Sequence, residues 1–137
     1  MKFAIHASLF ALIVGVCVFA QTKNIDGNWT VEYVSGLQVK TIGGAEFNFD
    51  THGDHLTGAA NVGVGWPGRA PISNGKFDGE HISFTVVGLQ GSSDGFPKMD
   101  FAGTIDGDEI KLTMAFYADG ERVSGKAAFE GKRTPNN

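Results

Sequence analysis

The chain has almost no cysteine and little proline. Its 137 residues include one cysteine, Cys17, and four prolines. Cys17 lies in an N-terminal apolar segment that we expect to be removed, so the remaining chain has no thiol for a disulfide, a cysteine nucleophile or a thiolate metal ligand. The 20 glycines follow no fixed period, which excludes a collagen-like repeat and indicates a folded domain with many turns.

Positive charge is also scarce. Lysine and arginine together number 11 against 15 aspartates and glutamates, which gives a formal net charge of −4. Nucleic acids and anionic membrane surfaces bind proteins through clustered lysines and arginines, so we expect neither as a partner. After residue 20 no segment repeats its apolar residues at helical spacing, which argues against a helical domain.

One long apolar run stands at the N-terminus. Lys2 precedes an almost wholly apolar stretch from Phe3 to Phe19, and the small residue Ala20 follows it. This order of charge, apolar run and small residue is typical of a secretory signal peptide. We therefore expect a signal peptide over residues 1–20 with cleavage after Ala20, one domain over residues 21–137, a secreted or periplasmic location, and no membrane attachment after cleavage.

Short glycine turns divide the rest of the chain into strands. Asp78-Gly79-Glu80 separates two segments of mixed apolar and polar residues, and similar turns recur around Gly53, Gly107 and Gly120. Such turns join antiparallel neighbours because glycine adopts a positive φ without steric cost. The alternation of apolar and polar residues predicts eight strands, over residues 29–33, 45–50, 55–62, 71–77, 81–87, 98–105, 109–117 and 121–131, with a bulge at Asn74-Gly75.

Eight consecutive antiparallel strands with one apolar face are enough to close a small barrel. Closure removes the exposed sheet edges, so the sequence predicts an all-β protein built as an eight-stranded antiparallel up-and-down barrel. A two-sheet β-sandwich is the alternative. A stripe of inward-facing aromatic residues would either line a ligand cavity or fill the barrel as its core: Phe47, Phe49, Phe84, Phe101, Phe116 and Phe129.

Alternate connections of an up-and-down barrel lie at the same end. The tight turns near Gly53, Gly79 and Gly107 therefore close one end, and the longer loops meet at the other, with the Gly120 turn beside them, over residues 35–44, 63–70 and 88–97. Loops gathered at one end of a rigid sheet are common binding sites, although they can also be plain solvated connections. The candidate ligand-binding residues at this open end are Leu37, Trp66, Arg69, Gln90, Phe96 and Lys98.

Three short motifs resemble catalytic or metal-binding patterns. Residues 63–68 match the dinucleotide-binding pattern G-x-G-x-x-G, but Pro67 and Pro71 prevent the helix that this motif requires. Residues 91–95 match G-x-S-x-G, but a strand rather than a helix follows. Metal-ligand residue types are densest in one turn, where they are also ordinary turn residues: Asp50, His52, Asp54 and His55. We expect no cofactor, no metal site and no catalytic residue.

The start of the first strand resembles a known family signature. Gly27-Asn28-Trp29 is similar to the G-x-W motif of the calycins, the lipocalins and their relatives. The resemblance implies a lipocalin-like or streptavidin-like barrel with structural roles for Gly27, Trp29 and Arg133, in which the tryptophan plugs one barrel end beneath a basic residue of the last strand, here Lys132 or Arg133. Residues 71–86 and 103–113 are also similar to small secreted bacterial β domains, some of them appended to glycoside hydrolases.

Together these features favour a non-enzymatic binding or accessory module over an enzyme. A small apolar or carbohydrate-like ligand would bind at the open end, where Trp66 and Phe96 offer stacking area and Arg69 and Lys98 would orient a polar or anionic group. The alternatives are a structural or protein-interaction barrel without a ligand cavity, and an enzyme built on a histidine and a nearby aspartate or associated with a hydrolase. The sequence sets no oligomeric state.

Overall fold

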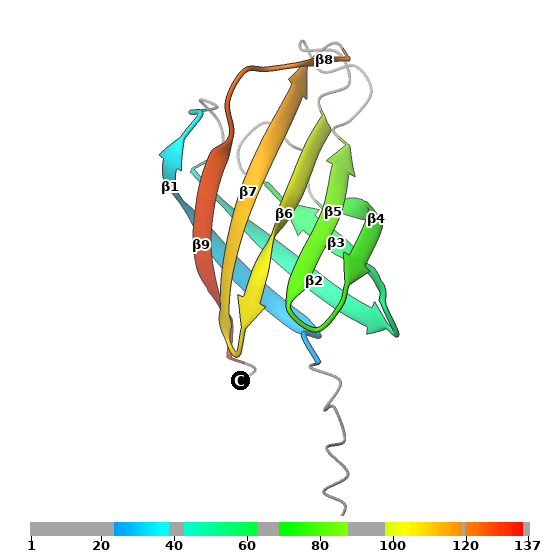
Figure 1. Cartoon of the computed structure of the whole chain (residues 1–137). Coiled ribbons are helices and arrows are strands. Elements are labelled where there is room, and N and C mark those ends of the chain that lie inside the picture. The colour runs from blue at the N-terminus through cyan, green and yellow to red at the C-terminus, as the bar shows by residue number, and fades with distance from the viewer. Residues whose placement is uncertain (1–23, 39–42, 63–68, 88–97, 119, 136–137) are drawn as a thin grey trace, which may run out of the picture.

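Every regular element that the structure describes is a β-strand. The computed structural model describes residues 24–38, 43–62, 69–87, 98–118 and 120–135. The strands in chain order are β1 (Gly27–Gly36), β2 (Gly44–His52), β3 (His55–Asn61), β4 (Ala70–Phe77), β5 (His81–Val87), β6 (Lys98–Asp106), β7 (Glu109–Ala118), β8 (Glu121–Arg122) and β9 (Ala127–Arg133) (Figure 1). None of the described ranges contains a helix long and apolar enough to span a membrane.

Eight of these strands close into a barrel. Each strand from β1 to β7 pairs antiparallel with the next, and β9 pairs with both β7 and β1. The ring therefore has no free edge, which confirms the eight-stranded antiparallel barrel and excludes the β-sandwich. The short strand β8 stands outside the ring and pairs with the end of β7, opposite the β6–β7 turn (Figure 1).

The prediction of one continuous last strand is wrong. Instead of one strand over residues 121–131, the chain forms β8, leaves the sheet over residues 123–126 and re-enters it as β9. Two positions explain the break: the Val123 amide bonds to the Phe116 carbonyl at 2.8 Å, and Gly125 then turns the chain with a φ of +94°. Because Val123, Ala127 and Phe129 share a parity, the sequence pattern does not show this interruption.

The turns and the bulge lie where the sequence predicts them. Gly53, Gly79 and Gly107 have φ values of +66°, +102° and +60°, which glycine adopts without the clash that a Cβ causes. Asn74 has a φ of +51°, and the pairing of β4 with β5 shifts register between Ser73 and Lys76. The extra residue lets Ile72 and Phe77, of opposite parity, both point into the barrel, where both are buried.

Candidate functional site

One end of the barrel is plugged by Trp29. Its side chain is 0% exposed, and its indole Nε1 donates a hydrogen bond to the Ile25 carbonyl at 2.9 Å. The guanidinium carbon of Arg133 lies 4.9 Å from the centroid of the indole, within the range of a cation–π contact. The burial expected for Trp29 is confirmed, and Arg133 rather than Lys132 covers the ring.

Arg133 also ties the segment before β1 to this end. Its Nη2 donates to the Asn24 carbonyl at 2.8 Å, and its Nε lies 3.2 Å from Asp108 Oδ1 as an ion pair that is not aligned as a hydrogen bond. Ile25 is 1% exposed, so the core includes a residue that precedes β1. A single apolar residue outside any strand gives no periodic signal. Gly27 follows as the first residue of β1, with a φ of +119°.

Asp26 fastens the same segment to β2. Its Oδ1 accepts hydrogen bonds from the Thr51 hydroxyl and the Thr51 backbone amide, both at 2.7 Å. Both bonds favour the ionised carboxylate, and the bond from the Thr51 hydroxyl has the larger effect. They hold the pKa of Asp26 below its usual value, although partial burial of the carboxylate opposes the shift.

A pH titration of stability checks this contact. Because the pKa of Asp26 is lowered in the fold, the unfolded chain protonates first as the pH falls below about 4, and the stabilisation decreases from there downward. The free energy of unfolding of the wild type should exceed that of Asp26→Asn by a constant amount between about pH 5 and 7, and the difference should narrow below about pH 4. A difference that stays constant down to about pH 2 would mean that the charge of Asp26 contributes nothing.

The middle of the barrel is filled by phenylalanine rings. Neighbouring rings pack with centroids 5.0 to 6.2 Å apart in stacked, edge-on and tilted arrangements. The rings in this cluster are 1–2% exposed and belong to Phe47, Phe49, Phe84, Phe101 and Phe129. Of the two interpretations of the aromatic stripe, these five follow the packed core. Phe116 differs, since it is only partly buried and lies near the open-end terminus of β7.

The side chains inside the barrel become smaller towards the open end. The buried residues closest to the open-end termini of the strands are smaller than phenylalanine: Ala45, Ala60, Val62, Ile72, Val86, Met99 and Ala127. Met114 lies one step deeper, opposite Phe101 of the ring cluster. Four partly buried residues pack above them as a collar: Tyr33, Leu37, Ala70 and Phe116. We call the apolar part of the barrel interior that these two groups form the cup. No polar or charged residue is buried in the described part of the chain, so this lining is apolar.

The described candidate ligand residues do not lie together. Leu37 packs against the core, and its amide bonds to the Lys126 carbonyl at 3.0 Å. Arg69 is exposed and lines a small polar groove of about 220 Å³ on the outer side of β1, β2 and β3, with Asn48 and Asn61. Trp66, Gln90 and Phe96 lie outside the described residues.

Lys98 lies on the outer wall of the barrel. It shares a face of β6 with Asp100, whose Oδ2 is 3.8 Å from the Lys98 ammonium, while Met99 between them points inward. The ammonium also lies 4.4 Å from the centroid of the Tyr117 ring on β7. Strand parity explains this placement, because Lys98 has the outward parity of Asp100.

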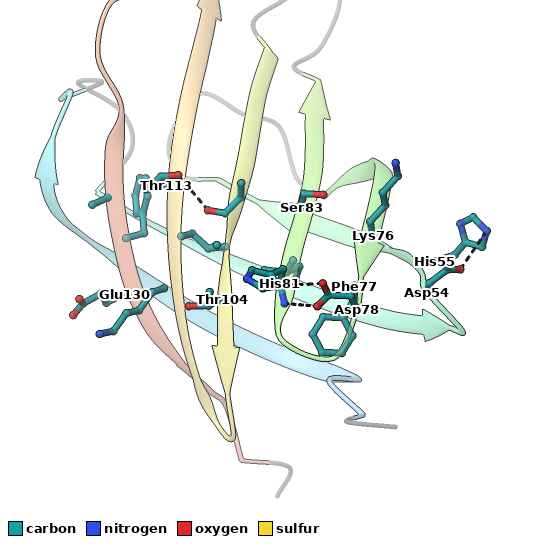
Figure 2. Close-up of a pocket in the computed structure, with 17 residues that line it drawn as sticks. Asp54, His55, Lys76, Phe77, Asp78, His81, Ser83, Thr104, Thr113 and Glu130 are labelled. Atoms are coloured by element: carbon teal, nitrogen blue, oxygen red, sulfur yellow. Dashed lines mark hydrogen bonds and ion pairs between the residues drawn. The ribbon is translucent and has the colours of Figure 1, made fainter. Parts of the chain in front are cut away.

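A larger groove crosses the outer wall of the barrel (Figure 2). It has a volume of about 970 Å³ and spans β4 to β7 and β9. Its floor is one cross-strand row of small side chains, Ser83, Ala102, Thr113 and Ala128, and the next row along the strands is larger, with His81, Thr104, Lys111 and Glu130. The hollow follows from this difference in side-chain size. The sequence contains both rows, but their alignment depends on register.

Histidine and aspartate pair at the rim of this groove. His81 Nδ1 is 3.1 Å from Asp78 Oδ2 (Figure 2). Asp78 Oδ1 accepts hydrogen bonds from the backbone amides of His81 at 2.7 Å and of Glu80 at 3.0 Å. These two bonds lower the pKa of the Asp78 carboxyl. The pair is well exposed. In the described part of the chain no three histidine, cysteine, aspartate or glutamate side chains are gathered around a common metal position.

Comparison with known proteins identifies the architecture. No protein-family model and no curated protein matches the sequence. The crystal structure of apo shwanavidin in its P1 form is similar in fold, with a TM-score of 0.54 over 80% of this chain and 98% of the shwanavidin chain, at 18% sequence identity. The fold is that of the avidins and streptavidin. This avidin-like barrel agrees with the expected calycin-like architecture, and at this identity the likeness concerns the fold alone.

Proposed function

We propose that this protein is a non-enzymatic binding module that holds a small apolar ligand in the cup. The observation that carries the proposal is the gradient of side-chain size, from the aromatic plug and rings to alanines, valines and methionines near the open end. Methionine side chains adapt to ligands of irregular shape because they are flexible and polarisable. The avidin-like architecture supports the proposal, since barrels of eight strands are just wide enough to hold one small ligand.

The chemistry of the cup narrows the ligand class. A carbohydrate needs several hydrogen-bonding side chains aimed at its hydroxyls, and burying unpaired hydroxyls costs about 1–3 kcal/mol each by mutational measures. The described interior contains no buried polar residue, and Arg69 and Lys98 occupy the outer wall. An apolar ligand therefore fits better than a carbohydrate-like one. Trp66 and Phe96 remain our candidates for stacking residues of the loops above.

We also propose that the protein acts outside the cytoplasm, as a secreted or periplasmic protein. The support is the N-terminal pattern of residues 1–20. Its small-ligand role and accessory role would then be exercised in the periplasm or the medium.

The neutral fluorescent probe N-phenyl-1-naphthylamine tests the cup. Its emission rises in apolar surroundings, and we expect saturable binding by the wild type. Ala70→Trp places an indole in the collar at a half-buried position, where it can block the mouth without overpacking the core. This variant should weaken probe binding by about tenfold or more, which corresponds to about 1.4 kcal/mol.

The matched control is Ala102→Trp, which adds the same side chain to the floor of the outer groove. It should leave probe affinity within about twofold of the wild type, a change below about 0.5 kcal/mol. If Ala102→Trp abolishes binding and Ala70→Trp does not, the probe occupies the outer groove and the cup is not the site. Absence of any binding would leave the solid interaction barrel as the better description.

A separate observation favours the second function, a protein-interaction barrel without a ligand cavity. A groove of about 970 Å³ with a floor of small side chains is a surface on which another molecule can lie close to the sheet. In that case the barrel is a rigid support, and the packed phenylalanine rings need no cavity beside them.

A further inference from the structure

The β2–β3 hairpin carries two histidines directly opposite each other. His52 and His55 are cross-strand partners that close a two-residue turn of Gly53 and Asp54. Gly53 has a φ of +66° and Asp54 a negative φ, the combination of a type II′ turn, which fixes the register of the pair. Directly opposed residues have Cβ atoms about 4.5–5.5 Å apart, so both imidazoles can reach one point above the outer face.

Two carboxylates flank this pair. Asp50 Oδ2 is 3.7 Å from His52 Nε2, and Asp54 Oδ1 is 3.7 Å from His55 Nε2 (Figure 2 shows the second pair). At this distance the groups attract each other but are beyond hydrogen-bond range, so neither imidazole is locked to its carboxylate. The four side chains are 61–87% exposed and can rotate at little cost.

We propose that the hairpin binds one divalent transition-metal ion, of the zinc, nickel or copper class, between His52 and His55. Two imidazole nitrogens about 2.0–2.1 Å from the ion would form the bond, and rotation of Asp50 or Asp54 would supply an oxygen ligand, with water in the remaining positions. The donor set of imidazole and carboxylate favours these ions over calcium, which prefers oxygen ligands alone. The two carboxylates also offset the charge of the ion.

One neighbouring positive charge, on Lys76, would repel the metal ion. Lys76 is the cross-strand partner of His55 on β4, on the side away from His52. Its ammonium is on a flexible stem and can turn towards the groove (Figure 2). The site is on the outer wall beside the tight turns, whereas the cup is at the other end, so metal binding and ligand binding are independent.

Titration calorimetry with zinc chloride, on protein purified without a polyhistidine tag, tests the proposal. We expect one ion per chain. His52→Gln and His55→Gln should each weaken zinc binding by about tenfold or more. Loss of a residue that only supports a metal ligand already lowers metal affinity by about that factor, and these two residues would be ligands themselves. His81→Gln is the matched control, since His81 is exposed and paired with a carboxylate but lies opposite Thr104 instead of a second histidine.

A nuclear magnetic resonance measurement on the wild type tests the same site without relying on the folding of the variants. Zinc should shift the imidazole resonances of His52 and His55 together and leave those of His81 unchanged. Calcium chloride should shift none of them. Three results would overturn the proposal. The wild type could fail to bind zinc, the double variant His52→Gln/His55→Gln could still bind it, or His81→Gln could lose as much zinc affinity as the two proposed ligand variants.

Discussion

Replacing Trp29 with alanine should lower the free energy of unfolding by about 3–5 kcal/mol. The indole is completely buried, donates a hydrogen bond to Ile25 through its Nε1 and lies under Arg133, so its removal opens a cavity and loses both contacts at once. For a domain of this size the loss is a large part of the total stability. Urea unfolding measures it, with the slope of the transition as a check for two-state behaviour.

Trp29→Phe is the conservative partner of this variant. It keeps an apolar ring in the plug but removes the Nε1 donor, and should lose clearly less than the alanine variant. Probe binding in the cup should be unaffected in Trp29→Phe because the plug lies at the other end. A loss below about 1 kcal/mol in Trp29→Ala would mean that the tryptophan does not close the barrel.

Gly131→Ala should be comparably damaging, with a loss of about 3 kcal/mol or more. Gly131 faces Val31 across the β1–β9 pairing, which completes the ring of strands. A Cβ at this position would collide with the Thr30 carbonyl oxygen and come within 2.6 Å of the Val31 Cα. Because the obstacle is backbone, the two strands must separate where the barrel closes.

Gly107→Ala serves as the control for Gly131→Ala. A Cβ at Gly107 meets nothing within 4 Å, although its φ of +60° remains unfavourable for alanine. This variant should cost only about 1–2 kcal/mol, the strain of one left-handed residue. Equal losses in the two variants, by urea unfolding, would show that β1 and β9 are not closely packed at Gly131.

Much of this fold follows from local chemistry in the sequence. Glycine turns at Gly53, Gly79 and Gly107 and strict alternation between them determine strand positions, and the opposite parity of Ile72 and Phe77 requires the bulge observed at Asn74. The break between β8 and β9 could not be read in this way, because Val123 and Ala127 keep the parity of one continuous strand.

The candidate site was less accessible to sequence reasoning. Position within or directly beside the long loops predicts Arg69 and Lys98 as ligand residues of the open end, but strand parity puts the Lys98 side chain on the outer wall beside Asp100, and Arg69 lines an outer groove. The cup and the row of small residues under the outer groove arise from register across several strands. Register is a property of non-local pairing, which a single sequence does not display.

The most direct measurement of the central claim uses the methionine methyl groups. Met99 and Met114 are both buried beneath the collar, and the remaining methionine, Met1, belongs to the expected signal peptide. With methyl-labelled methionine, titration with N-phenyl-1-naphthylamine should shift the Met99 and Met114 resonances in the wild type and leave them unmoved in Ala70→Trp. Saturable probe binding that leaves both methionine resonances unchanged would contradict a ligand site in the cup.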